Sequence, residues 1–236
     1  MPVAQTGRAA GERKPKSLGM EPEALARLQT EGRDRFEAEF DVSRETLAAL
    51  DRYVTLLTEW QTRMNLVATS TLGAVWQRHI ADSMHLIALV PRFETAADLG
   101  SGGGLPGIVM AIVRPASRVH LIESVGKKAT FLRAVADDLG LNTHVHARRI
   151  ETCGQALAQS DIITARALAS LDTLCGLVAP HLKPGARCFF SKGANHDAEM
   201  ETARAHWSFE VKQHASPLSE GSVILEIAGI KRRRRA

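Results

Sequence analysis

The sequence predicts an α/β protein with a mostly parallel sheet, an antiparallel hairpin at its C-terminal end and a helical extension at its N-terminal end. Beyond residue 91, short apolar runs alternate with amphipathic stretches, a pattern typical of strands joined by crossover helices. A glycine-rich loop directly follows the first of these runs. The last two apolar runs, 208–215 and 222–229, are only six residues apart, so they predict a hairpin.

The first ninety residues precede this alternation and divide into two parts. Residues 1–20 are rich in Gly, Ala, Lys and Arg without apolar periodicity, so we expect a disordered basic arm. Residues 21–90 are predicted to be helical because apolar residues recur at helical spacing over 43–64 and again over 72–87. Ser43 has the side chain of a helix N-cap, and Pro91 should end the second stretch.

Residues 91–230 are predicted to form the core of the fold, and residues 231–236 a basic tail. Strands are expected near 95–99, 119–123, 143–147, 161–165 and 186–191. Helices are expected near 106–113, 127–139 and 170–182. Pro106 suits the first position of its helix, and Gly140 should end the following one.

The basic tail decides the sign of the net charge. Five cations stand between Lys231 and Arg235, whereas the whole chain carries a net charge of +4, so the remainder carries −1. Such a run indicates either an anionic partner, most often nucleic acid, or a solvated terminus that aids solubility.

The composition argues against a membrane protein and a disulfide-stabilised protein. No apolar run approaches the roughly 18 residues that a membrane span requires, and the basic N-terminus lacks the apolar stretch of a secretory signal. We therefore expect a cytoplasmic location. The three cysteines are not spaced for a disulfide framework or a zinc site, and Cys175 and Cys188 are expected in the core.

The stretch "DLGSGGGLPG", residues 98–107, holds five glycines in ten positions. Bare backbone lets a ligand approach closely, and the following helix offers free N–H groups to an anion. The pattern of a phosphate-binding P-loop is absent. One frame fits the GxGxxG fingerprint of dinucleotide-binding proteins, at Gly102, Gly104 and Gly107. The other resembles the first motif of Rossmann-like S-adenosylmethionine-dependent methyltransferases, an acid followed by alternate glycines: Asp98, Gly100, Gly102 and Gly104.

A carboxylate stands where either cofactor would need one. Glu123 ends the second predicted strand, 19 residues beyond Gly104. A carboxylate at about this spacing accepts hydrogen bonds from the ribose hydroxyls of a nucleotide cofactor. We favour this role over the alternative, an unremarkable charge at the end of a strand.

Five further stretches resemble one family in their order and spacing. They are "NLVATS" and "RHIADS" before the loop, and "LIESVGKKATFLRAVADDLGL", "ARRIE" and "ITARALASL" after it. From about residue 43 onward the chain resembles the glucose-inhibited division protein B family, bacterial enzymes that methylate guanine N7 in small-subunit (16S) ribosomal RNA. The resemblance implies a Rossmann-like class I methyltransferase fold and S-adenosylmethionine as cofactor. It also implies that the partner is this RNA or its ribonucleoprotein.

The resemblance further implies which residues contact the cofactor. Gly100 and Leu105 would do so within the loop. Ile150 and Glu151 would lie beside the adenine, one covering the base and the other reading its edge. Arg166 ends the fourth predicted strand, where cofactor and guanine would meet.

Methylation at guanine N7 is consistent with the absence of the motifs that serve other methylation targets. The D/N-P-P-aromatic motif that serves methylation of exocyclic amines is absent after the fourth strand. Cys153 follows the third strand, the wrong place for the nucleophile of pyrimidine C5 methylation. Guanine N7 has a lone pair and no hydrogen, so its attack on a methyl group needs no general base. We therefore predict no catalytic acid or base, and a rate that depends on proximity and alignment.

Cations and hydrogen-bond donors are expected to hold the guanine or its phosphate, and the candidates are Arg78, His79, Arg166 and Lys192. His79 lies on an apolar stripe with Asp82 three residues on, so a core histidine bonded to that carboxylate is the favoured alternative. For Arg166, the alternative to a role in binding RNA is an ion pair with Glu123 or Glu151.

No metal site is predicted, because His144 and His146 lie on one strand without a third ligand. Two other functions compete with methyl transfer. A nicotinamide-dependent oxidoreductase would use the GxGxxG frame, but a second domain and an acid–base pair are missing. A non-catalytic RNA-binding protein would have no need of the intact loop. We expect the protein to be a monomer.

Overall fold

The computed structural model describes residues 18–216 and 221–234, so most of the predicted arm and the end of the basic tail lie outside it. Within these residues, seven strands form one sheet in the order β3-β2-β1-β4-β5-β7-β6. The strands are β1 (Thr95–Leu99), β2 (Arg118–Ile122), β3 (Thr143–His146), β4 (Ile162–Arg166), β5 (Arg187–Lys192), β6 (Trp207–Ala215) and β7 (Val223–Arg232).

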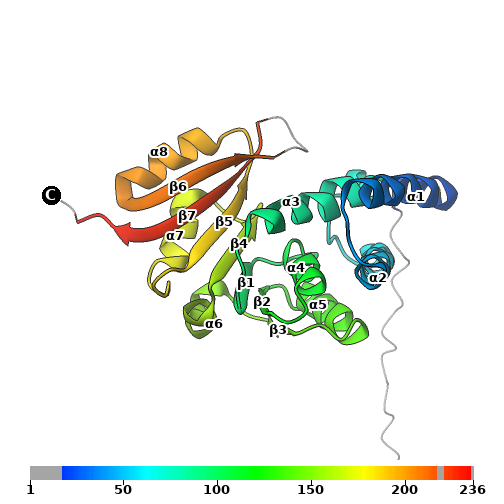
Figure 1. Ribbon diagram of the computed structural model, residues 1–236, viewed down its shortest axis with the longest axis horizontal. Helices are drawn as coiled ribbons and strands as arrows, with labels where there is room; N and C mark the ends of the chain where they lie inside the picture. Colours follow the sequence, from blue (N-terminus) through cyan, green and yellow to red (C-terminus); the bar gives the residue numbers. More distant parts are fainter. Residues whose placement is uncertain (1–17, 217–220, 235–236) are drawn as a thin grey trace, which may run out of the picture.

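The sheet is parallel from β3 to β5, whereas β7 pairs antiparallel with both β5 and β6. The predicted mostly parallel sheet with an antiparallel C-terminal hairpin is therefore confirmed (Figure 1). The strand order reverses at β1, which lies between β2 and β4. In open α/β sheets, the carboxyl ends of the strands at such a reversal form the usual ligand crevice.

Apolar side chains alternate along the strands and build a core on each face of the sheet. Ala96 of β1 belongs to one core, and its neighbour Ala97 belongs to the other. Helices α4 (Gly107–Val113) and α5 (Gly126–Asp138) cover the first face together with the N-terminal helices. Helices α6 (Gly154–Gln159), α7 (Leu171–Val178) and α8 (His196–His206) cover the second, which Figure 1 shows on the opposite side of the sheet.

The N-terminal extension is helical, as predicted. It contains α1 (Pro22–Glu39), α2 (Arg44–Gln61), a 3-10 turn (Thr69–Thr71), a π-helical segment (Trp76–Ala81) and α3 (Asp82–Leu89). The hydroxyl of Ser43 accepts a hydrogen bond from the backbone N–H of Thr46 (3.2 Å), which confirms the predicted N-cap. None of the helices in residues 18–216 and 221–234 combines the length and apolar character needed to cross a bilayer.

Several helix and strand boundaries differ from the prediction. Pro106 precedes α4 as its N-cap instead of occupying its first turn. Helix α7 ends at Val178, four residues before the predicted end. Strand β7 continues through Lys231 and Arg232, which pair with β6, so the first two residues of the predicted tail belong to the sheet. Helices α6 and α8 were not predicted.

Candidate functional site

Two neighbouring cavities open at the carboxyl ends of the parallel strands. The first, which we call the glycine-loop cavity, has a volume of about 430 Å³, and its lining includes Gly100, Gly102, Glu123, Ile150 and Glu151. The second, which we call the arginine cavity, has a volume of about 350 Å³, and its lining includes Thr71, Arg78, His79, Asp82 and Arg166. Ala167 lines both, so the two cavities meet at the residue that follows β4.

The glycines of the loop serve two purposes. Gly100 and Gly102 have positive φ angles and line the glycine-loop cavity. A Cβ atom on Gly102 would meet only a backbone oxygen at 3.6 Å, because this position faces open space. A Cβ atom on Gly104 would instead lie 2.5 Å from Cγ1 of Ile108, so this glycine allows close packing of the loop on α4.

Two of the predicted cofactor contacts do not line this cavity. Gly104 and Leu105 are outside the lining of the glycine-loop cavity, and Leu105 is buried in the first hydrophobic core. The loop turns inward after Gly102, so its second half contacts the protein. The sequence motif does not separate these roles, because glycine meets both requirements.

Glu123 supports the loop and borders the cavity. One carboxylate oxygen accepts a hydrogen bond from the backbone N–H of Gly102 (2.9 Å), and the other accepts one from Val125 (2.7 Å). The residue is only 6% exposed. Because each carboxylate oxygen has a second lone pair, both can still accept a hydrogen bond from a ligand hydroxyl.

Asp98, which we predicted as a cofactor contact, lies beneath the loop and is absent from the lining of the cavity. It is 1% exposed and accepts a hydrogen bond from the hydroxyl of Thr164 on the neighbouring strand (2.8 Å). Burial raises the pKa of its carboxyl group to about 6, because a charged carboxylate is costly away from water. Asp98 thus joins β1 to β4 under the glycine-loop cavity.

The 3-10 turn after β3 (Ile150–Thr152) supplies the opposite wall. Ile150 is half-buried and offers an apolar surface to the cavity. Glu151 is exposed, and its carboxylate pairs with Arg149 (3.2 Å). A backbone hydrogen bond and Arg149 lower the pKa of Glu151, so the group is negatively charged at neutral pH.

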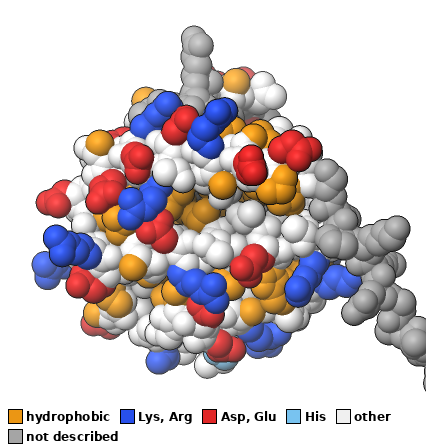
Figure 2. Space-filling view, turned by 90° about the vertical axis from the view of Figure 1, so that its right-hand side faces the viewer, with side chains coloured by type: hydrophobic (Ala, Val, Ile, Leu, Met, Phe, Trp, Pro, Cys, Tyr) orange, Lys and Arg blue, Asp and Glu red, His pale blue; other side chains and the backbone are white. Residues whose placement is uncertain are grey.

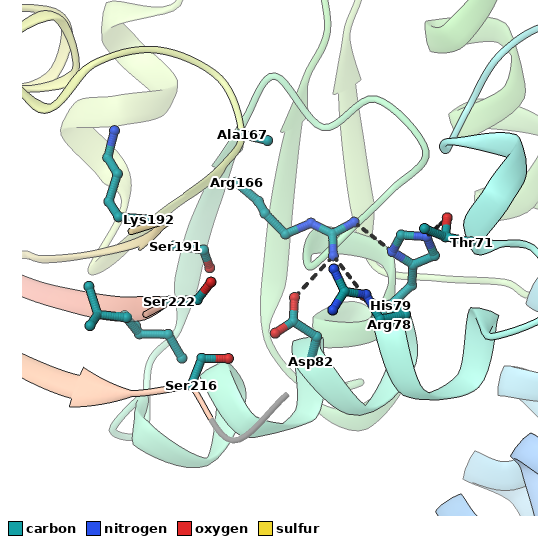
Figure 3. A pocket seen from close by; sticks show the side chains of 13 residues that line it. Thr71, Arg78, His79, Asp82, Arg166, Ala167, Ser191, Lys192, Ser216 and Ser222 are labelled. Atoms are coloured by element: carbon teal, nitrogen blue, oxygen red, sulfur yellow. Dashed lines mark hydrogen bonds and ion pairs between the residues drawn. The ribbon is translucent and has the colours of Figure 1, made fainter. Parts of the chain in front are cut away.

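Arg166 is the centre of the arginine cavity (Figure 3). Its Nη1 donates to Oδ2 of Asp82 (3.1 Å) and, at 3.4 Å, to the backbone carbonyl of Arg78. Its Nη2 donates to Nδ1 of His79 (3.1 Å). The ion pair that we considered for Arg166, with Glu123 or Glu151, is therefore wrong, because the side chain turns toward the N-terminal helices.

His79 is buried and neutral. Because guanidinium groups only donate, Nδ1 of His79 is the acceptor from Arg166 and Nε2 carries the proton. Nε2 then donates to the hydroxyl of Thr71 (2.8 Å), which itself donates to the carbonyl of Ala68. Burial, with Arg166 and Arg78 nearby, lowers the pKa of His79 to about 3. The expected bond from His79 to Asp82 is absent among the described contacts, since Arg166 occupies that carboxylate.

Lys192 is not available to hold a base or a phosphate, although it was a candidate. The residue is 9% exposed, and its ammonium group bonds to the carbonyl of Ala169 and the carboxylate of Glu199 (2.7 Å). Figure 3 shows its side chain directed away from Arg166. Arg78 is exposed at the rim of the arginine cavity.

From the sequence we considered Asp82 only as a partner of His79. We assigned no role to several other lining residues, namely Thr71, Ala167, Ser191, Ser216 and Ser222. Asp82 carried one usable signal, because it follows Arg78 by four residues on a helix and so shares its face. The serines carried none, because they come from β5 and from both sides of the hairpin loop.

A third histidine joins the two on β3. The strand register places His120 beside His144, and His120 shares a hydrogen bond with His146 (3.1 Å between Nδ1 and Nε2). Burial, with His144 nearby, lowers the pKa of His146 to about 4. No group of side chains in the described part of the chain could hold a metal ion. Cys153 is buried beside this cluster, and burial raises the pKa of its thiol.

Comparisons with known proteins match the part of the chain that contains the glycine loop. The family model of rRNA small subunit methyltransferase G (GidB) matches residues 46–223. A protein named ribosomal RNA small subunit methyltransferase G from Cereibacter sphaeroides is 48% identical over 192 residues, which cover 79% of this chain and 91% of the relative. The protein of that name from Brucella anthropi is 43% identical over 195 residues, covering 81% and 92%.

Solved structures support the fold. A variant of MtNAS in complex with S-adenosylmethionine superposes with a TM-score of 0.54 at 16% identity, covering 89% of this chain and 92% of that one. Fibrillarin in its complex with Nop5p superposes with a TM-score of 0.50 at 11% identity, covering 64% and 81%. The family model spans the glycine loop, both cavities and most of the sheet. The chain therefore belongs to the rRNA small subunit methyltransferase G family.

Proposed function

We propose that this protein transfers the methyl group of S-adenosylmethionine to N7 of a guanine in small-subunit (16S) ribosomal RNA. The observation that carries the proposal is the family match over residues 46–223, which include the lining of both cavities except Ile224, and their junction at Ala167. One cavity is proposed to hold the cofactor and the other the guanine.

The glycine-loop cavity has donors and acceptors that suit this cofactor. Glu123 would accept hydrogen bonds from the ribose hydroxyls, and the bare backbone at Gly100 and Gly102 would lie against the methionine part. Ile150 would cover the adenine, while Glu151 lies at its edge. When bound there, S-adenosylmethionine supplies an electrophilic methyl group on a positively charged sulfur. Residues 91–230 would thus bind the cofactor, and residues 21–90 would complete the guanine side.

The reaction requires the side chains only to align the guanine with the methyl group. The N7 lone pair forms a bond to the methyl carbon, the carbon–sulfur bond breaks, and the positive charge moves from sulfur to the base. No proton is transferred, so we assign no catalytic acid or base. Holding the two reactants in line is the protein's contribution, worth up to roughly 7–11 kcal/mol in favourable cases.

Mapping of RNA methylation by mass spectrometry tests this proposal. Small-subunit RNA, naked and assembled, is incubated with the protein and S-adenosylmethionine, and 7-methylguanine is expected at one position. No added methyl group on either substrate would contradict the proposal. Stabilisation by S-adenosylhomocysteine in a thermal-shift assay should exceed that by NADH, and the reverse order would favour an oxidoreductase.

We further propose that the protein acts as a monomer in the cytoplasm, on the RNA or its ribonucleoprotein. The RNA partner follows from the proposed reaction. Light scattering during size-exclusion chromatography, with and without RNA, would test the oligomeric state. A stable dimer in both samples would overturn this part of the proposal.

A further inference from the structure

We propose that the Arg166–Asp82 pair recognises the Watson–Crick edge of the target guanine, and that Asp82 determines specificity for guanine over other purines. This inference rests on the proposed function, because it assigns the base to the arginine cavity. It adds a role for Asp82 beyond its ion pair with Arg166.

Recognition of guanine requires contacts away from the reacting atom. Adenine also has N7, so this atom cannot distinguish the two purines. Guanine presents an acceptor, O6, followed by two donors, the N1–H and the 2-amino group. Adenine presents a donor, its 6-amino group, followed by the acceptor N1. A guanine-specific wall must therefore offer a donor beside acceptors.

The arginine cavity has such a wall. The guanidinium of Arg166 and the carboxylate of Asp82 lie side by side, joined at 3.1 Å. Among the described residues that line this cavity, Asp82 is the sole carboxylate. Arg166 donates to Oδ2 of this carboxylate, and Oδ1 accepts no hydrogen bond from the described residues, so it can accept a donor from the base. The pair thus presents the donor and acceptors that cytosine offers to guanine in a base pair.

Arg166 keeps donors for the base after its own contacts are made. Of its five N–H groups, the contacts to Asp82, His79 and the Arg78 carbonyl use three. The Nε–H group and one N–H of Nη2 remain for O6. The three contacts also fix the plane of the guanidinium, so its position does not depend on the RNA.

The order of groups along the wall also orients the base. Figure 3 shows Ala167 and Asp82 on opposite sides of the Arg166 guanidinium. In guanine, O6 lies between N7 and N1. When O6 contacts Arg166, and the N1–H and the 2-amino group contact Asp82, N7 therefore faces Ala167. Because Ala167 also lines the glycine-loop cavity, N7 then points toward the proposed methyl donor.

The competing explanation is that the Arg166–Asp82 ion pair only stabilises the fold. The exposure of the two side chains favours recognition of the base instead. The side chains of Arg166 and Asp82 are 21% and 25% exposed, so both remain accessible from the cavity. A pair that only joined β4 to the N-terminal helices would affect all substrates equally. The ratio of rates on two substrates therefore separates the explanations.

The test compares two synthetic RNAs, one with guanine at the mapped position and one with inosine, which lacks only the 2-amino group. The wild-type protein should favour guanine in kcat/KM by about 5- to 150-fold, the range of one well-placed base contact. Asp82→Ala should make the two rates about equal, while Asp82→Glu should restore part of the preference. Affinity for S-adenosylhomocysteine should stay unchanged in both variants.

Asp138→Asn is the matched control. It removes the ion pair between Arg52 and Asp138, which lies away from the arginine cavity. It should keep the full preference for guanine. If Asp82→Ala shows no turnover, the preference is measured by competition between the two RNAs for binding. If Asp82→Ala does not fold, Asp82→Asn is used in its place. An unchanged ratio in the Asp82 variants overturns this inference. No methylation of the guanine RNA by the wild-type protein overturns the proposed function instead.

Discussion

At the scale of single residues, two glycines of the loop should respond differently to substitution. Gly102→Val would place a branched side chain in the glycine-loop cavity, at a positive φ that also strains the loop, and should weaken binding of S-adenosylhomocysteine about tenfold or more. Gly104→Ala would press on Ile108 and should cost about 1–3 kcal/mol of stability. Calorimetric titration and urea unfolding measure the two effects. Undiminished affinity in Gly102→Val would mean that the cofactor binds elsewhere.

His79 should make stability depend on pH. Its folded-state pKa of about 3 lies below the ordinary value of 6.5, so the unfolded chain takes up the proton first as pH falls. Its contribution is therefore present above pH 6.5 and is lost progressively between pH 6.5 and 3, at about 1.4 kcal/mol per pH unit. In His79→Gln, the free energy of unfolding should fall less between pH 7 and 5. Urea unfolding at several pH values gives these curves, and parallel curves for the two proteins would refute the assignment.

At the scale of elements, α2 supports the glycine loop through one buried hydroxyl. Tyr53 is fully buried and donates to the carbonyl of Gly103. Tyr53→Phe leaves that carbonyl without a partner, so we expect a loss of about 1–3 kcal/mol in stability and weaker binding of S-adenosylhomocysteine. Thr55→Ala, at an exposed position on the same helix, is the control and should change stability by less than about 0.5 kcal/mol. Equal effects in both variants would rule out this support.

The elements that the sequence predicted are those with strong apolar patterns. The strands of the parallel sheet were found within one or two residues. For β1, β2 and β4 the reason is that nearly every residue is buried, so their sequences are mostly apolar. Helix α8 was missed because it buries only Met200 and Ala203, so it has little apolar stripe. Helix α6 has six residues, too few for periodicity to appear.

At the scale of the whole molecule, the two cavities differed in how far they were predictable. The glycine-loop cavity depends on short motifs at strand ends, so Gly100, Gly102 and Glu123 could be identified from the sequence. The arginine cavity depends on contacts between β4 and the helix that carries His79 and Asp82, more than eighty residues apart. Nothing local in the sequence specifies those contacts, which explains why the alternative partners that we considered for Arg166 and His79 were wrong.

The ends of the molecule also differ in charge. Figure 2 views the end that carries α1 and α2, and it shows acidic and basic side chains interspersed there. At the other end, β7 leads away from the arginine cavity, which Val223 lines, toward Arg232 and the arginines that follow. Nine steps of extended chain span about 30 Å. The described part of the basic tail, residues 231–234, therefore lies far from the proposed guanine, and there it would contact a distant part of a large RNA.

This separation predicts a defect in RNA binding without a defect in chemistry. Replacing Arg233, Arg234 and Arg235 with Gln should raise the KM for RNA and leave kcat at saturating RNA unchanged. The slope of log affinity against log salt should become shallower by up to about 0.7–0.9 for each arginine that contacts a phosphate. Filter binding over a range of salt concentrations measures this slope. The control replaces three exposed arginines of α1 and α2, Arg27, Arg35 and Arg44, with Gln. If both triple variants change the slope equally, the effect comes from net charge, and the tail has no specific role in binding RNA.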